Sequence, residues 1–174
     1  EDELISTITF LLVAGHETTV NLIGNGTLAL LNNPDQFDLL KSDPEAHVKS
    51  AVEEMLRYDS PVQMTARWVL EEVEHDGNTF EVGHQVAIMF AAANRDPERF
   101  ENPNTFAITR ENNKHLAFGN GIHFCLGAPL ARVEGQIAFR LLCERVPNLK
   151  LATDTPEYRK TYLLRGLQHL PVTF

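Results

Sequence analysis

The sequence predicts a mainly helical fold with small β elements. Apolar residues recur at helical spacing over residues 3–32 and again over residues 126–145, whereas residues 62–88 contain short β-type runs. The chain has 174 residues, of which 43% are hydrophobic and 22% charged. This composition is typical of one globular domain, or of part of one, and excludes disordered and fibrous classes.

The first predicted helix covers residues 3–32. Its apolar residues lie on several faces, so we expect a buried central helix rather than a surface helix. The pair Asn33-Pro34 ends it, and shorter helices follow over residues 34–41 and 44–58. The residues of the third helix expected to face inward are Ala51, Val52, Met55 and Leu56.

The middle of the chain predicts strands over residues 65–70, 79–82 and 86–88, with a hairpin turn at 75–78 (His-Asp-Gly-Asn) and a short helix over 89–94. Residues 95–124 show no clear periodicity and are rich in Pro, Asn and Gly. A loop of this length inside a domain is usually functional.

The last predicted helix covers residues 126–145, and the tail, residues 149–174, predicts short strands with turns at Pro156 and Gly166. The apolar residues that share one face of this helix are Leu130, Val133, Ile137, Leu141 and Leu142.

Composition excludes several functions. The formal net charge of -9 argues against a nucleic-acid binder, and two cysteines are too few for a disulfide framework or a Cys-rich zinc site. Acidic residues predominate in residues 1–60 and basic residues in 110–174, so the basic end could face an acidic partner or anionic ligand, or be an ordinary solvated surface. No apolar run is long enough to span a membrane. The chain opens on Glu1 without Met, so we expect a piece of a longer protein.

The segment F-G-N-G-I-H-F-C-L-G, residues 118–127, lies directly before the last predicted helix. Its glycines allow a tight turn, and the amino end of the helix stabilises a thiolate at Cys125. With no Cys or His at zinc spacing, this thiolate suits a single axial bond to one metal. The alternative is a buried free thiol, which is our interpretation of Cys143 in the middle of the last helix.

The segment A-G-H-E-T-T, residues 14–19, lies in the first predicted helix. Gly15 permits a local groove, and the Thr18 hydroxyl can bond to the carbonyl four residues earlier or release it. The alternative is an amphipathic helix with a polar patch. A zinc site of the H-E-x-x-H type is excluded because Val20 stands four residues after His16.

Glu54 and Arg57 form the pattern E-x-x-R on the helix over residues 44–58. Residues three apart share one side of a helix, so they can form a charge-assisted pair. The alternative is a surface ion pair that contributes little energy.

Together these segments resemble the signatures of the cytochrome P450 family: F-x-x-G-x-H/R-x-C-x-G, A/G-G-x-D/E-T-T and E-x-x-R. A-N-R-D-P at residues 93–97 looks like the soluble bacterial branch. The resemblance covers residues 1–174 and implies the C-terminal, haem-binding portion of the fold, because family chains are more than twice this long.

The resemblance implies that Cys125 binds the iron of haem b, that His123 and Arg67 bind the haem propionates, and that Phe118 shields the sulfur. It also implies that Glu17 supplies protons and that Thr18 stabilises the oxygen intermediates. The remaining residues expected beside the haem are Gly119 and Gly127 in the cysteine loop and Ala14 and Gly15 in the first helix.

The family pair E-x-x-R meets a third residue, an Arg from the later loop. The string P-E-R-F occurs at residues 97–100, but the spacing to the cysteine favours Arg110. His115 and Arg132 are expected near the haem or the redox-partner face, and His16 off the haem face. The resemblance places Val62, Gln63, Met64, Leu163 and Leu164 along the substrate pocket, although their composition alone would suit an ordinary core.

The implied function is that of a cytoplasmic haem-thiolate monooxygenase, which inserts one oxygen atom from O2 into a small organic substrate. Its electrons come from NAD(P)H through a ferredoxin or flavodoxin. The alternatives are a peroxygenase driven by hydrogen peroxide and a haem-binding or haem-free fragment without activity. A fragment would expose a large apolar patch and self-associate or domain-swap.

Overall fold

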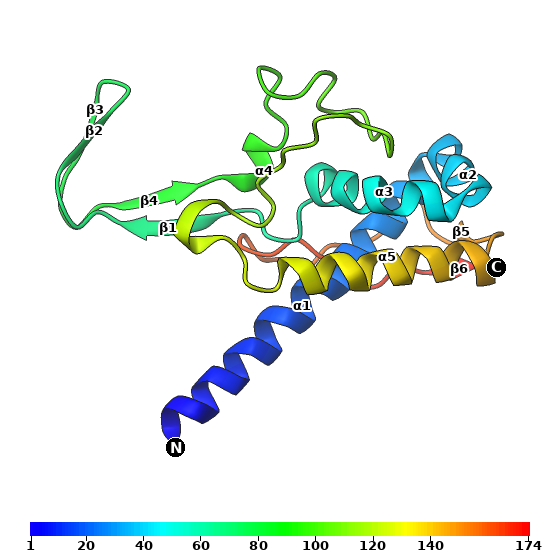
Figure 1. Cartoon of the computed structure of the whole chain (residues 1–174), viewed down its shortest axis with the longest axis horizontal. Helices are drawn as coiled ribbons and strands as arrows, with labels where there is room; N and C mark the ends of the chain where they lie inside the picture. The colour runs from blue at the N-terminus through cyan, green and yellow to red at the C-terminus, as the bar shows by residue number, and fades with distance from the viewer.

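The computed structural model describes residues 1–174 and confirms a mainly helical fold with small sheets (Figure 1). The helices are α1 (Asp2–Asn32), α2 (Pro34–Ser42), α3 (Pro44–Tyr58), α4 (Phe90–Ala93) and α5 (Ala128–Arg145), with a 3-10 helix η1 (Gly121–His123) before α5. None of these helices combines the length and hydrophobicity that a membrane span requires.

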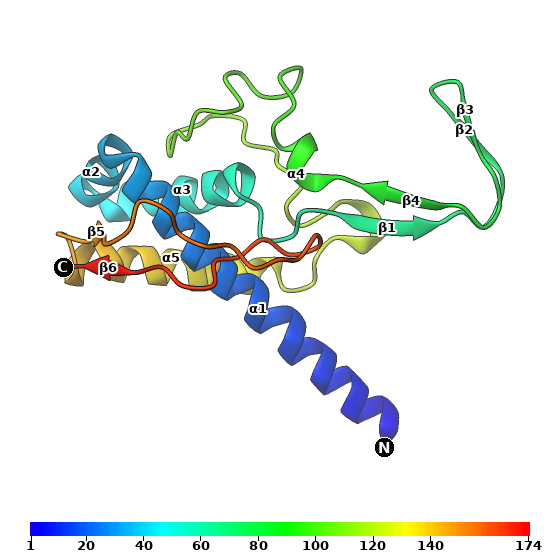
Figure 2. The same cartoon turned by 180° about the vertical axis from the view of Figure 1, so that it is seen from behind.

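The strands form three separate antiparallel pairs: β1 (Thr65–Trp68) with β4 (Gln85–Ile88), β2 (Val73–His75) with β3 (Asn78–Phe80), and β5 (Lys150–Leu151) with β6 (Val172–Thr173). The β2–β3 hairpin projects beyond the β1–β4 ladder, as both views show (Figures 1 and 2).

The expected hairpin turn is present, but one of its flanking strands was not predicted. Asp76 and Gly77 both adopt positive φ, 49° and 74°, which is the backbone of a tight two-residue turn. The turn joins β2 to β3, whereas β1 pairs with β4. Residues 71–74 read Glu-Glu-Val-Glu, and this run of acids obscures the alternation that would have indicated a strand.

The core lies where α3, α5 and the C-terminal half of α1 pack together. The four residues expected inward on α3 are all buried. Glycine permits the closest helix contacts: a Cβ on Gly26 of α1 would lie 2.6 Å from Phe139 of α5, and one on Gly135 of α5 would lie 3.3 Å from Leu22 and Val52. The helices therefore meet along small residues.

The apolar face of α5 that the periodicity indicates is not the face that packs into the core: Leu130, Val133 and Ile137 are 61%, 51% and 47% exposed. The buried residues of α5 are instead Ala128, Gly135, Phe139 and Cys143. Small residues lie on this face because it approaches α1 and α3 closely, and apolar periodicity alone does not register a glycine as an inward residue.

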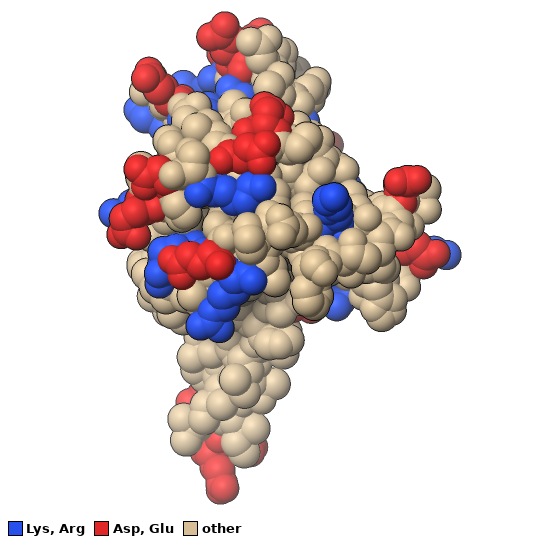
Figure 3. Space-filling model, turned by 90° about the vertical axis from the view of Figure 1, so that its right-hand side faces the viewer, with Lys and Arg blue, Asp and Glu red and all other residues tan.

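The prediction of a buried central helix holds for the C-terminal half of α1 and is wrong for its N-terminal half. Residues 1–16 are exposed, and burial begins at Asn21. This half of the helix projects from the body, and Figure 3 shows it as a surface with few charges apart from acidic side chains at its tip. Its exposed large apolar residues are Leu4, Ile5, Ile8, Phe10, Leu11, Leu12 and Val13.

Candidate functional site

The cysteine loop turns sharply between Phe118 and Cys125. The Cys125 N–H donates to the Phe118 carbonyl at 2.9 Å, and the Ala128 N–H donates to the Cys125 carbonyl at 3.2 Å. Gly119 and Gly121 have φ of 72° and 66°, which L side chains rarely adopt. These two glycines therefore let the loop close and place Cys125 three residues before α5 begins.

Cys125 is exposed, and several of its sequence neighbours are exposed apolar residues. Ile122, Phe124 and Leu126 are 97%, 50% and 89% exposed around it in sequence. Even a Cβ on Gly127 would lie 3.8 Å from the sulfur, so nothing on that side crowds it. An accessible thiol among apolar side chains fits a flat, largely apolar group whose metal takes one sulfur ligand.

Cys143 lies in a different environment. It is 6% exposed, and burial raises the pKa of its thiol to about 11. The interpretation of Cys143 as a core residue is confirmed.

The first-helix motif lies where α1 leaves the body. Ala14 and Gly15 are exposed, and the helix remains α-helical through both. The Thr18 hydroxyl donates to the Ala14 carbonyl at 2.8 Å. Of the two states expected for this hydroxyl, bonded to that carbonyl or released from it, the structure shows the bonded one. Glu17 is ion-paired with Arg159 of the tail at 3.0 Å, a partner that no sequence pattern indicated.

Glu54 is fully buried and receives donors from several segments. Arg57 donates to both of its oxygens at 2.8 Å, and Arg110 Nε lies 3.2 and 3.1 Å from the same two oxygens. The Ala107 N–H and Asn113 Nδ2 complete the shell at 2.9 and 3.1 Å. The structure thus brings together the three residues that the sequence grouped, and adds two that it missed.

The two arginines also bind the long loop through its main chain. Arg57 donates to the carbonyls of Asn94, Pro103 and Thr105. Arg110 donates to the carbonyls of Glu101, Asn102 and Thr105. Arg57 and Arg110 therefore order a stretch of chain that has almost no secondary structure of its own.

Arg67 and His123 are not joined to each other or to Cys125 by a hydrogen bond. Arg67, half-buried on β1, donates to the Thr65 hydroxyl and the Ala66 carbonyl at 3.1 and 2.8 Å. His123 is exposed at the end of η1. Their roles as propionate ligands stay predictions.

His115 and Arg132 converge on one carboxylate, that of Glu53 on α3. His115 Nε2 lies 3.0 Å from Glu53 Oε2, and Arg132 Nε lies 2.6 Å from Oε1. Glu53, one residue before Glu54, carried no signal in the sequence beyond its charge.

The two segments expected to line the substrate pocket lie side by side. Val62 forms a β-bridge with Leu164, and the Gln63 N–H donates to the Leu163 carbonyl at 2.9 Å. Met64 is half-buried. Whether these residues contact substrate stays a prediction.

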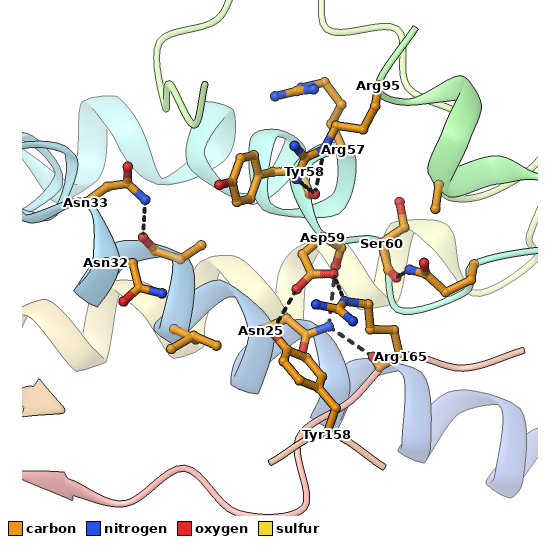
Figure 4. Close-up of a pocket in the computed structure, with 14 residues that line it drawn as sticks. Asn25, Asn32, Asn33, Arg57, Tyr58, Asp59, Ser60, Arg95, Tyr158 and Arg165 are labelled. Atoms are coloured by element: carbon orange, nitrogen blue, oxygen red, sulfur yellow. Dashed lines mark hydrogen bonds and ion pairs between the residues drawn. The ribbon is translucent and has the colours of Figure 1, made fainter. Parts of the chain in front are cut away.

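A cavity of about 410 Å³ lies beside these segments, between α1, the end of α3 and the tail (Figure 4). Asn25 Nδ2 donates to the Arg165 carbonyl at 2.9 Å, and Arg165 Nε lies 2.6 Å from Asp59 Oδ1. Burial raises the pKa of Asp59, against the opposing effect of the Arg165 charge. Cys125 does not line this cavity, and its polar groups mainly tie the tail to α1 and α3.

Nowhere in the chain do three or more His, Cys, Asp or Glu side chains gather as a candidate metal site.

Comparison with known proteins gave consistent matches. The family model for cytochrome P450 matches residues 46–146. The chain is 51% identical to the polyketide biosynthesis cytochrome P450 PksS of Bacillus subtilis (strain 168), over 99% of this chain and 43% of that protein. It is 48% identical to the 6-deoxyerythronolide B hydroxylase of Saccharopolyspora erythraea, over 98% of this chain and 43% of that protein.

Solved structures agree. The PksS structure matches with a TM-score of 0.94 at 51% identity, covering 98% of this chain and 45% of that one. P450BioI, solved in complex with an acyl carrier protein ligated to hexadec-9Z-enoic acid, matches with a TM-score of 0.91 at 51% identity, covering 95% of this chain and 42% of that one. The chain therefore spans less than half the length of the relatives it matches.

Proposed function

Because this chain belongs to the cytochrome P450 family, we propose that it is the haem-binding portion of a monooxygenase that inserts one oxygen atom from O2 into a small organic substrate. We base this proposal on the Cys125 thiol, which lies exposed on a glycine-containing turn just before α5. Proteins of this family bind haem b through a cysteine thiolate.

We assign the haem contacts to this chain's residues as follows. Cys125 supplies the thiolate, which pushes electron density onto the iron and favours cleavage of the O–O bond. His123 and Arg67 bind the propionates, and Phe118 keeps water from the sulfur. Gly119 and Gly127 in the cysteine loop, with Ala14 and Gly15 on α1, leave room for the macrocycle.

Proton delivery is assigned to α1. The Thr18 hydroxyl, bonded to the Ala14 carbonyl, can turn from that acceptor to hold a water molecule. Glu17 supplies the proton after releasing Arg159, to which it is ion-paired. Both groups act only if the N-terminal half of α1 faces the haem.

We propose that the substrate lies against Val62, Gln63, Met64, Leu163 and Leu164. Its relatives include a polyketide biosynthesis enzyme, a hydroxylase of 6-deoxyerythronolide B and a protein solved with a carrier-bound fatty acid, which supports an apolar organic substrate. Electrons would come from NAD(P)H through a ferredoxin or flavodoxin, in the cytoplasm.

The optical spectrum of the reduced, carbon-monoxide-bound protein tests the haem assignment. The Soret band is expected at the red-shifted position of thiolate ligation, and Cys125→Ser abolishes that band. Cys143→Ser is the matched control, because Cys143 is buried away from the loop, and it leaves the spectrum unchanged. A normal spectrum for Cys125→Ser would overturn the proposal. Turnover with hydrogen peroxide and no reductase would identify a peroxygenase instead.

We also propose that the chain by itself self-associates through the exposed apolar half of α1. Sedimentation velocity tests this, because Leu12→Glu is expected to return the chain to a monomer. Association that persists unchanged in this variant would exclude this face.

A further inference from the structure

A continuous set of contacts connects Glu53 on α3 with the cysteine loop, residues 118–127. Glu53 on α3 binds the Arg132 guanidinium on α5 with both oxygens, at 2.6 and 2.9 Å. The same carboxylate binds His115 Nε2 at 3.0 Å. One side chain of α3 thus connects α5 with the residues that lead into the loop.

The histidine in this set has a defined tautomer. His115 Nδ1 accepts the Ala117 N–H at 3.2 Å, so Nε2 carries the hydrogen that is donated to Glu53. The His115 side chain is only 2% exposed. Two donors, one neutral and one cationic, therefore converge on the single negative charge of Glu53.

The set continues to the cysteine itself. The Arg132 guanidinium lies 4.6 Å above the centre of the Phe118 ring, and that ring contacts Phe124 edge-on at 6.3 Å. The Phe118 carbonyl accepts the Cys125 N–H at 2.9 Å. A shift of Arg132 would therefore release the ring that packs beneath the loop and loosen the turn that carries the sulfur.

Glu53 remains ionised in this setting. Burial is the largest single effect and acts to raise its pKa, but the hydrogen bonds from His115 and Arg132, together with the Arg132 charge, outweigh it and lower the pKa to about 2. Its side chain is 28% exposed and that of Arg132 is 31% exposed, so the pair is only partly screened by water. Glu53 therefore balances the charge of the Arg132 guanidinium near the Cys125 sulfur at neutral pH.

We propose that Glu53 is a positioning residue for the cysteine loop: it holds the Arg132 guanidinium against Phe118 and balances its charge beside Cys125. The effect on the bound haem rests on the function proposed above. The effect on the loop does not, because every contact that carries it lies within this chain.

Hydrogen exchange in the haem-free chain tests the effect on the loop. Glu53→Gln keeps the shape of the side chain but removes its charge, and it is expected to speed exchange of the Cys125 amide severalfold. Glu144→Gln is the matched control, since it breaks the Arg140–Glu144 pair of 2.9 Å on α5, the helix that carries Arg132, at the end far from the loop in sequence. Unchanged exchange in Glu53→Gln, or equal acceleration in both variants, would overturn the proposal.

The reduction potential of the haem-loaded protein separates a charge effect from simple loosening. Removing the anion with Glu53→Gln is expected to raise the potential, and removing the cation with Arg132→Gln to lower it, because an added positive charge near the iron favours the reduced state. The double variant is expected to return close to the wild-type potential. Shifts in the same direction for both single variants would reduce Glu53 to a structural role and overturn the charge assignment.

The two readouts also distinguish failure of this proposal from failure of the proposed function. A protein that shows no thiolate-type spectrum would refute the haem assignment, yet exchange at Cys125 would still decide whether Glu53 holds the loop. If Glu53→Gln does not fold, Arg132→Gln supplies the same exchange test, because it removes the other half of the pair from a partly exposed site.

Discussion

Arg110 Nε donates to both carboxylate oxygens of Glu54, at 3.2 and 3.1 Å, although the two residues are 56 positions apart in the sequence. The Glu54 side chain is fully buried and that of Arg110 is 10% exposed. The i, i+3 pair with Arg57 is thus only part of the charge balance at this site.

Removing Arg110 should therefore be costly. Arg110→Met leaves Glu54 with a single cation and removes three hydrogen bonds to loop carbonyls, so we expect a loss of about 3 kcal/mol or more in the free energy of unfolding, measured by urea denaturation. Arg99→Met is the control: it removes the arginine of the literal P-E-R-F string, which is exposed, and should change stability by less than about 0.5 kcal/mol. A larger loss in the Arg99 variant would reverse our assignment.

Gly24 and Gly26, which are two residues apart on α1, should respond to substitution by alanine in opposite ways. A Cβ at Gly26 would lie 2.6 Å from Phe139 and 2.7 Å from Met55, so Gly26→Ala should destabilise the chain by about 1–3 kcal/mol. At Gly24 the nearest atom, in Leu167, would be 3.9 Å away, so Gly24→Ala should be neutral or stabilise by up to about 1 kcal/mol. Thermal unfolding measures both. Equal effects would contradict the close packing of Gly26 against Phe139 and Met55.

The two cysteines should differ in reactivity. Iodoacetamide is expected to label Cys125 in the native, haem-free chain, because its thiol is exposed. Cys143 should stay unlabelled until the chain unfolds, because it is buried and its pKa is raised to about 11. Peptide mass mapping before and after addition of urea distinguishes the sites. Native labelling of Cys143 would show that the core packing around α5 opens readily.

Glu53 should contribute stability that depends on pH. Its pKa is lowered from 4.5 to about 2 on folding, so its contribution is fully present above about pH 4.5 and is lost as the pH falls toward 2. At pH 7 we expect Glu53→Gln to be less stable than the wild type by on the order of 1–2 kcal/mol, given its partial exposure. Urea titrations at a series of pH values should show this difference closing below pH 4.5. A constant difference down to pH 3 would argue against ionic pairing.

Local signals predicted the helices well and their packing less well. Pro34 and Pro44 stand at the first positions of α2 and α3, so these starts could be predicted from neighbouring residues alone. The inward face of α5 could not, because it depends on Gly135 meeting Leu22 and Val52. The spacing of apolar residues along one helix does not reveal which other helices it will pack against.

The same division applies to the candidate site. Spacing within one helix turn indicated Glu54 with Arg57, and the motif around Cys125 indicated the loop. The Ala107 N–H and the Asn113 amide reach Glu54 from 53 and 59 residues away, and no short pattern encodes such contacts. Glu53 was missed for a similar reason, because both of its partners come from other segments.

Arg57 and Arg110 hold the long loop mainly by hydrogen bonds to its carbonyl oxygens, although the Arg57 guanidinium also lies 5.4 Å above the centre of the Phe100 ring. Every amino acid offers a carbonyl, so Thr105 and most of its neighbours could be exchanged for many others without loss of these hydrogen bonds. Asn102 is an exception, because its φ of 47° lies in the left-handed region, which favours Gly, Asn and Asp. An inserted or deleted residue, however, would move several oxygens out of reach of their donors at once. This stretch of chain should therefore tolerate many substitutions but few insertions or deletions.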